Sequence, residues 1–327
     1  MFGKSEAMII EAGGVLIMVS QHEFLAQDDP AFQSFFQPGA TLERISTGYI
    51  WVEGPVWLDD ISELRFSDIP NNRMMTWSEE KGTRVFRQPS QRTNGSAVDR
   101  GGNMVSCEHG GRCISRTGKD GTYEVLATHW QGKRLNSPND LVVKSDGSIW
   151  FTDPPYGIIS DHEGIRADSE IGSNNVYRLD PSTGEVELVA GDFDRPNGLA
   201  FSPDESVLYI ADSGRARGHG FGFDDSRPHH VRALEVLDDT KLGASSVVAD
   251  IDMVPDGLRV DTEGLLWISA VDGIHCYTPE GRRLGRILIP EVVANLTFGG
   301  SNGSRLFITA TSSVYAVETT RKGAERA

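Results

Sequence analysis

One short pattern recurs along this 327-residue chain and restricts the folds that are open to it. A polar residue precedes a small residue, an apolar run, a turn rich in Gly, Asp or Asn, and a second run with an aromatic residue. Three copies are clear and three are weaker. The clear copies are PNDLVVKSDGSIWFTD (138–153), PNGLAFSPDESVLYIAD (196–212) and PDGLRVDTEGLLWISA (255–270), and the weaker ones begin at Glu53, Asn94 and Asn295.

Each copy predicts an antiparallel hairpin, because β-forming apolar residues flank a tight turn. The leading polar residues are separated by 39 to 59 residues, and a spacing near 40 suits one four-stranded blade. Six copies therefore predict an all-β fold, a six-bladed β-propeller. The two longest intervals leave room for loops at 159–174 and 214–230. A β-sandwich would also contain many short strands, but it would not predict equivalent polar positions in six hairpins.

We expect the propeller to occupy residues 40–327 and residues 1–39 to form an N-terminal extension, partly helical near 31–36 or irregular. This extension would cap the propeller or contact a partner. We expect the protein to be a monomer or a homodimer. The stretch at 8–19 is moderately apolar, but Glu11 interrupts it and no small-residue cleavage site follows. We interpret it as neither a signal peptide nor a membrane span, and expect the cytoplasm rather than the periplasm.

The net charge of −16, from 31 Lys and Arg against 47 Asp and Glu, disfavours nucleic acids and anionic membranes as partners. The same charge is compatible with divalent cations, although an acidic surface often serves solubility alone. Cys107, Cys113 and Cys276 are too few for a disulfide framework, which fits a reducing compartment.

The first strand of each blade lines the channel of a propeller, so the six leading polar residues should converge on one ring. An Asn-Gly or Asp-Gly pair is often only a turn device, but these pairs precede the strand instead of forming the turn. Two carboxylates and several amide oxygens suit Ca²⁺, which takes 6 to 8 oxygen ligands, better than Zn²⁺. The ring residues are Glu53, Asn94, Asn139, Asn197, Asp256 and Asn295.

Four motifs, in one order along the chain, resemble the senescence marker protein (regucalcin) and gluconolactonase family over residues 48–317. They are EGPVW from Glu53, LNSPNDLVVKSDGSIWFTDPPYG from Leu135, RPNGLAFSPDESVLYIADS from Arg195 and VPDGLRVDTEGLLW from Val254. CEHGGR from Cys107 and GKRLNSPND from Gly132 look like the bacterial gluconolactonase branch.

This resemblance implies a six-bladed propeller that opens a sugar lactone with one catalytic divalent metal, an enzyme of carbohydrate metabolism. It implies Glu53, Asn197 and Asp256 as metal ligands, with Asn139 as a fourth ligand or a substrate contact. The animal branch has an Arg where this chain has Ser137, so contacts made there cannot be transferred. Ca²⁺ is the expected ion, although Zn²⁺, Mn²⁺ or Mg²⁺ could also occupy an oxygen site.

The hypothesis for catalysis is that the metal polarises the lactone carbonyl and positions a water, while Asp256 acts as ligand and general base beside Glu53. Arg134 would stabilise the anionic product, unless it forms a salt bridge instead. His109 would serve as acid or base near the channel mouth, or as a structural histidine. Tyr156, which follows two prolines, would line the wall of the pocket.

Two other functions stay open on the sequence alone. The same metal site could hydrolyse a phosphotriester, because a Lewis acid polarises a phosphoryl oxygen as well as a carbonyl. A propeller can also serve as a non-catalytic scaffold for protein partners. The sequence has no Gly-x-Ser-x-Gly elbow, phosphate loop or dinucleotide fingerprint, which leaves metal-assisted hydrolysis as the preferred interpretation.

Overall fold

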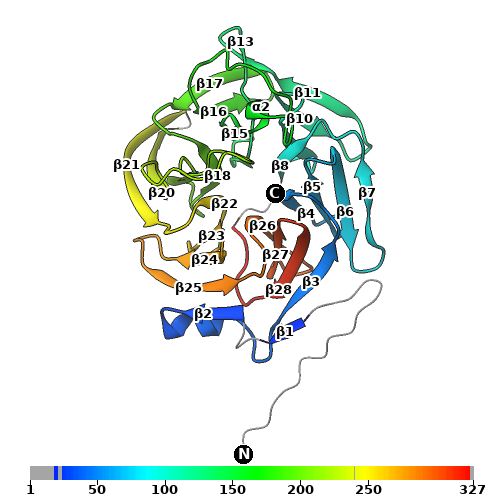
Figure 1. Ribbon diagram of the computed structural model, residues 1–327, viewed down its shortest axis with the longest axis vertical. Helices are drawn as coiled ribbons and strands as arrows, with labels where there is room; N and C mark the ends of the chain where they lie inside the picture. The colour runs from blue at the N-terminus through cyan, green and yellow to red at the C-terminus, as the bar shows by residue number, and fades with distance from the viewer. Residues whose placement is uncertain (1–17, 21–23, 239, 325–327) are drawn as a thin grey trace, which may run out of the picture.

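The computed structural model describes residues 18–20, 24–238 and 240–324. Six antiparallel sheets surround a central channel, which confirms the predicted six-bladed β-propeller (Figure 1). All six predicted hairpins form, and each supplies the first two strands of one blade. Among the described residues, none forms a helix with the length and apolar character that a membrane crossing requires.

The blades are numbered from the first hairpin, and their strands are listed from the channel outward. Blade 1 contains β4 (Val52–Leu58), β5 (Glu63–Asp68), β6 (Arg73–Ser78) and β7 (Gly82–Arg87). Blade 2 contains β8 (Thr93–Val98), β9 (Met104–Glu108), β10 (Cys113–Thr117) and β11 (Tyr123–Ala127). Blade 3 contains β14 (Leu141–Val143), β15 (Ile149–Asp153), β16 (Asn175–Asp180) and β17 (Glu185–Ala190).

Blade 4 contains β18 (Pro196–Phe201), β19 (Val207–Asp212), β20 (His230–Asp238) and β21 (Lys241–Asp250). Blade 5 contains β22 (Pro255–Val260), β23 (Leu266–Ala270), β24 (Gly273–Tyr277) and β25 (Arg283–Leu288). Blade 6 contains β26 (Val293–Gly299), β27 (Arg305–Ala310), β28 (Ser313–Glu318) and, from the N-terminal part of the chain, β3 (Thr41–Thr47). A separate hairpin of β12 (His129–Trp130) and β13 (Lys133–Arg134) follows blade 2, and helix α2 (Tyr156–Ile159) follows β15.

The ring of blades is closed by a pairing between the two ends of the described chain. Strand β3 pairs antiparallel with β28, from Thr47 opposite Ser313 to Glu43 opposite Ala316. The last blade therefore takes its outer strand from a segment that precedes the first blade. Closure of this kind leaves no blade without neighbours on both sides.

Aromatic side chains fill the spaces between neighbouring blades. Trp57 of blade 1 stacks on Phe307 of blade 6 with ring centroids 5.2 Å apart, and Trp150 of blade 3 meets Phe201 of blade 4 edge to face at 5.4 Å. These contacts explain why five of the six hairpins, all but that of blade 2, carry aromatic residues, because large rings dominate the packing of faces such as these.

In blades 1, 2, 4 and 5, glycine follows the leading polar residue because neighbouring channel strands approach closely at that level. A β-carbon on Gly54 would lie 1.9 Å from the carbonyl oxygen of Asn94, and one on Gly198 would lie 2.4 Å from that of Asp256. Only glycine fits such an approach without moving backbone. The pairs of polar residue and glycine therefore belong to the channel wall and not to the hairpin turns.

The described residues of the N-terminal extension, 18–20 and 24–39, lie at the outer edge of the propeller, away from the channel (Figure 1). Strand β1 (Met18–Ser20) pairs with β3, and β2 (Leu25–Gln27) pairs with β25 at the edge of blade 5. The segment expected to be helical forms a 3₁₀ helix, η1 (Pro30–Phe35), whose first turn is capped by the Asp29 carboxylate. Most of the apolar stretch at 8–19 lies outside the described residues.

The extension should contribute strongly to stability through Phe32. This side chain is fully buried, lies 6.3 Å from Trp267 between ring centroids, and packs on Gly285 of β25. We expect Phe32→Ala to lower the free energy of unfolding by about 3–5 kcal/mol, measured by urea denaturation. Phe221, which is 54% exposed, gives a control, since its replacement by Ala should change stability by less than about 0.5 kcal/mol. Equal effects of the two replacements would contradict this assignment.

Candidate active site

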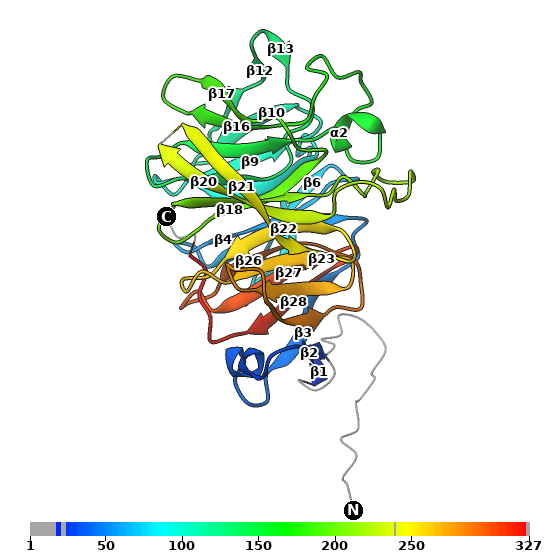
Figure 2. The ribbon, with the colours of Figure 1, turned by 90° about the vertical axis from the view of Figure 1, so that its left-hand side faces the viewer.

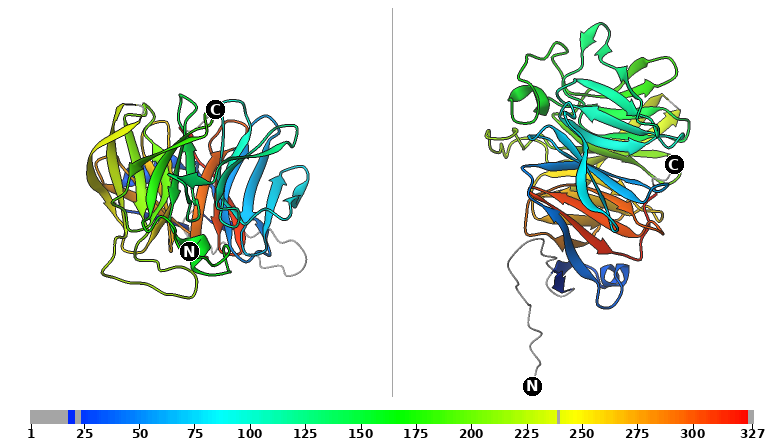
Figure 3. Two further views of the ribbon diagram at one scale, coloured as in Figure 1. Left: turned by 90° about the horizontal axis from the view of Figure 1, so that it is seen from above. Right: turned by 90° about the vertical axis from the view of Figure 1, so that its right-hand side faces the viewer.

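A cavity of about 350 Å³ opens at the end of the channel where the first strands of the blades begin. Helix α2 and the loop between β19 and β20 project at one end of the propeller (Figures 2 and 3), and residues of both line this cavity. The structure brings together most of the predicted site. Its lining includes Glu53, Asn94, Asn139, Tyr156, Asn197 and Asp256.

Glu53 begins the channel strand of blade 1 and is only 3% exposed. Its carboxylate accepts hydrogen bonds from the backbone N–H of Gly54 at 2.6 Å and from the side-chain amide of Asn295 at 3.1 Å. Burial, and then the charge of Asp140, raise the pKa of Glu53 to about 8. Within the described part of the chain, no Lys or Arg forms a salt bridge with this carboxylate.

Asp256 lies near the start of the channel strand of blade 5. The residue is partly exposed, while its carboxyl is largely removed from water. Burial and, after it, the charge of Glu53 raise the pKa of this carboxyl well above its usual range, while a hydrogen bond with the Asn197 side chain opposes the rise. Among the described residues, Asp256 also has no Lys or Arg partner in a salt bridge. Burying two carboxylates that repel each other, with no cation between them, costs free energy. A cation bound in this pocket would offset that cost.

The donor set of the pocket fits a hard divalent cation. Asn139 and Asn197 are each 5% exposed, and Oδ1 of Asn94 is buried without a hydrogen-bond partner. No group of three or more His, Cys, Asp and Glu side chains within the described ranges is arranged to hold a metal. An ion here would therefore be held by two carboxylates together with amide oxygens, an all-oxygen set that suits Ca²⁺.

A buried polar network supports the pocket from inside the channel. Asp140 occupies the position in blade 3 where four other blades have glycine. Its Oδ2 accepts hydrogen bonds from Asn295 at 3.3 Å and from Arg259 at 3.4 Å. Asn295 thus links the carboxylates of Glu53 and Asp140. The sequence predicted Asn295 as a residue of the ring but did not indicate what it binds. No sequence motif indicated that Asp140 and Arg259 would support the pocket, although both lie within the predicted hairpins.

His109 does not lie where an acid or base at the channel mouth was expected. It is fully buried, with Nδ1 3.2 Å from the carbonyl oxygen of Glu163 and Nε2 3.2 Å from the side-chain nitrogen of Asn94. Because a carbonyl only accepts, Nδ1 carries the proton and Nε2 accepts from the Asn94 amide. Burial lowers the pKa of His109 to about 4, so the ring is neutral near pH 7. It positions Asn94 and does not line the cavity.

Arg134 and Tyr156, the other two expected substrate contacts, lie in different places. The Arg134 guanidinium donates to the carbonyl oxygen of Gly111 at 3.1 Å and does not line the cavity, so the expected contact with an anionic product does not fit its position. Tyr156 does line the cavity, and its hydroxyl donates to the carbonyl oxygen of Ser213 at 3.2 Å.

Two loops that the sequence predicted only as insertions complete the mouth. Glu163, from the loop after α2, lines the cavity, and burial raises the pKa of its carboxyl to about 7. The rings of His162 and His219 stack with centroids 3.6 Å apart, which joins this loop to the loop between β19 and β20. Glu163 could not be recognised in the sequence because nothing in its loop repeats between blades.

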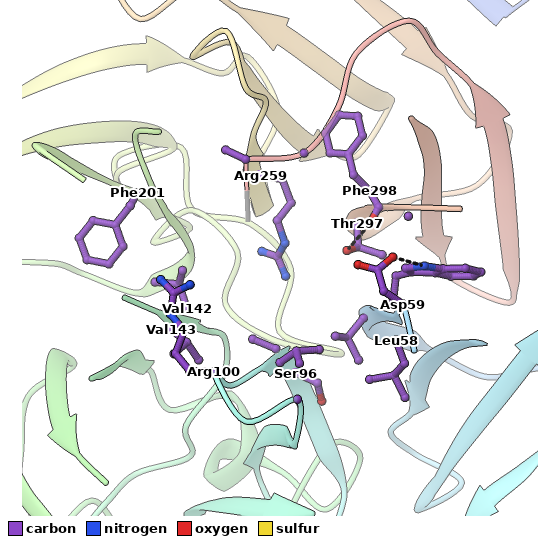
Figure 4. A pocket seen from close by; sticks show the side chains of 18 of the residues that line it. Leu58, Asp59, Ser96, Arg100, Val142, Val143, Phe201, Arg259, Thr297 and Phe298 are labelled. Atoms are coloured by element: carbon purple, nitrogen blue, oxygen red, sulfur yellow. Dashed lines mark hydrogen bonds between the residues drawn. The ribbon is translucent and has the colours of Figure 1, made fainter. Parts of the chain in front are cut away.

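The opposite end of the channel holds a second cavity of about 370 Å³ (Figure 4). It is lined by the far ends of the channel strands, and Arg259, Arg100 and Asp59 are among its charged residues. This end lacks the ring of leading carboxylate and amide residues, so the candidate reaction centre lies at the first cavity.

Fold and site together define a six-bladed propeller with a two-carboxylate, amide-lined pocket at one channel mouth. Residues 51–312 match the model of the family described as "SMP-30/Gluconolactonase/LRE-like region". The chain therefore belongs to this family, as the sequence motifs indicated.

Individual relatives agree with this assignment. A gluconolactonase of Zymomonas mobilis is 33% identical over 315 residues, which cover 89% of this chain and 84% of that protein. The solved structure of a gluconolactonase from Xanthomonas campestris is 34% identical, with a TM-score of 0.84 and coverage of 95% and 99%. Regucalcin from Agrobacterium tumefaciens, described as a calcium-binding protein, shares the fold at 17% identity, with a TM-score of 0.69 and coverage of 89% and 96%.

Proposed function

We propose that this protein is a calcium-dependent lactonase that opens a sugar lactone of the gluconolactone type to its aldonic acid. The observation that carries the proposal is the pair of buried carboxyls, Glu53 and Asp256, which share one pocket with amide oxygens and have no cationic partner among the described residues. Two gluconolactonases at 33% and 34% identity support the reaction class.

Three side chains, Glu53, Asn197 and Asp256, would hold the ion, and Asn139 would be a fourth ligand or contact the lactone. Such an ion supplies Lewis acidity that polarises an ester carbonyl and lowers the pKa of a bound water. Two carboxylates neutralise a double charge, so the pocket would accept an uncharged lactone. All-oxygen donors and the calcium-binding relative favour Ca²⁺ over Zn²⁺, Mn²⁺ or Mg²⁺.

The chain's own residues would perform the proton transfer and the orientation of the substrate. Asp256 would accept the proton of the attacking water, since the second carboxyl, Glu53, is already fixed by two hydrogen bonds. Asn139 would donate from its side-chain amide to the lactone oxygen. Tyr156 and the loop with Glu163 would limit the access of water to the reacting carbon.

The proposal is tested by acid release from D-glucono-1,5-lactone in weak buffer near pH 6.5, with the spontaneous rate subtracted. Protein stripped of metal should be inactive, and Ca²⁺ should restore turnover more effectively than Mg²⁺, Mn²⁺ or Zn²⁺. Absence of turnover on a panel of lactones with every ion would reject the reaction class. Faster hydrolysis of paraoxon than of any lactone would assign the site to phosphotriesters, and full activity without metal would reject the metal dependence.

A further inference from the structure

Polar and apolar side chains line different parts of the pocket. The carboxylates of Glu53 and Asp256 lie near the start of the channel strands of blades 1 and 5. Blades 2 to 4 and the loop after α2 contribute polar side chains, namely Asn94, Asn139, Asn197 and Glu163. Blades 5 and 6 contribute four valines, and the segment that enters blade 1 contributes an indole. This apolar part is called the valine wall, and it consists of Trp51, Val254, Val271, Val292 and Val293.

Two apolar side chains that line this cavity are well exposed. Val292 is 38% exposed and Phe223, which also lines the cavity, is 63% exposed. Exposed apolar residues are ordinary when scattered, but a group that gathers at one pocket marks a binding surface. Since the valine wall lines the same cavity as Glu53 and Asp256, a substrate that enters the pocket contacts it.

A lactone with hydroxyl groups on every ring carbon should bind weakly beside the valine wall. Each hydroxyl that faces the valines loses water without gaining a hydrogen-bond partner, which opposes binding. An apolar substituent at the same position removes valine and indole surface from water, which favours binding. Polar groups on the other edge of the lactone still reach the amides and Glu163.

We propose, on the basis of the lactonase function above, that the preferred substrates are lactones with an apolar edge, such as an alkyl substituent beside the ring oxygen. The ester group faces the ring of carboxylates and amides, and the substituent lies against the valine wall. The fully hydroxylated sugar lactones are then poorer substrates of the same site.

The test compares kcat/KM for δ-decalactone, which carries a pentyl group, with that for unsubstituted δ-valerolactone and for D-glucono-1,5-lactone. We expect δ-decalactone to exceed both by at least about tenfold, because added methylenes in an apolar pocket favour the transition state. Val271→Thr and Val292→Thr keep the side-chain shape but add a hydroxyl. Each should lower the ratio of δ-decalactone to δ-valerolactone by about three- to tenfold.

The control is Val85→Thr, at a 48% exposed valine on the outer strand β7, which should leave the ratio unchanged. A ratio near one in the wild type, or a ratio that neither pocket variant alters, would overturn the proposal. Loss of binding to phospholipid vesicles in Phe223→Ser, with the ratio unaltered, would assign the apolar mouth to a membrane surface and also overturn it.

A second measurement separates this proposal from the lactonase function itself. Calorimetric titration uses the lactam of δ-decalactone, which resists hydrolysis, and piperidin-2-one, its unsubstituted counterpart. Tighter binding of the pentyl lactam, weakened by Val271→Thr, supports the apolar edge even if no lactone is hydrolysed. Equal binding of the two lactams contradicts the valine wall, whatever the enzyme's activity.

Discussion

Asp256→Asn should lower kcat/KM for lactone hydrolysis by at least about 10³-fold, because the change removes both a metal-binding charge and the base that receives the proton of water. The amide keeps the shape of the side chain and cannot accept that proton at neutral pH. The fold should persist, since the carboxyl is a buried, repelled group and not a structural ion-pair partner. The measurement is acid release with Ca²⁺ present, beside calorimetric Ca²⁺ binding.

Two variants give this experiment its controls. Asp59→Asn changes the same residue type at the opposite cavity, where Asp59 is exposed and accepts from the Trp57 indole, and activity should stay within about twofold. Glu53→Gln should weaken Ca²⁺ binding, and excess Ca²⁺ should restore part of its activity, because Asp256 is retained. Activity of Asp256→Asn within tenfold of the wild type would remove Asp256 from the mechanism.

Metal-free protein should become less stable as the pH rises from about 6.5 to 8, and Ca²⁺ should abolish this loss. Folding raises the pKa of Glu53 from 4.5 to about 8 and that of Glu163 to about 7. Between the unfolded and folded values, the native state holds a proton that the unfolded state has released. Stability therefore falls with pH, by about 1.4 kcal/mol per unit for each such carboxyl.

The histidines do not reverse this expectation within the chosen window. His109, with its pKa lowered to about 4, adds stability as pH rises only up to its usual value of 6.5. Above that value the raised carboxyls dominate. Thermal unfolding of metal-stripped protein at pH 6.5, 7.25 and 8 measures the effect, and Glu53→Gln should show a shallower decline. A constant or rising Tm in the metal-free wild type would contradict the ionisation assigned to this pocket.

Two results would together show that the carboxyls are the reason the pocket needs a cation. They are the loss of activity in Asp256→Asn and the fall in stability of the metal-free protein with rising pH. In the metal-free state their charges repel in a site with little water, so protonation stabilises the fold. A bound divalent ion would favour the ionised forms instead, and its affinity should therefore rise with pH while binding releases protons.

The sequence alone determined the propeller, the six hairpins and the ring of leading polar residues. These features are local: the leading polar residue, the turn and the two apolar runs of each copy lie within about 16 residues, and their repetition sets the number of blades. The glycine after Glu53 or Asn197 could be recognised in the sequence, although its reason, the close approach of the next channel strand, became visible only in the structure.

The tertiary structure decided everything that depends on residues far apart in the chain. It pairs β3 with β28 and links Glu53 to Asp140 through Asn295. It also decides between the two roles expected for His109, an acid or base or a structural histidine, because the ring is buried and hydrogen-bonded to Asn94. It also gathers valines from separate blades into one wall of the pocket. None of these has a local signature, because the burial and charge of a side chain come from neighbours that only the closed ring of blades brings into contact.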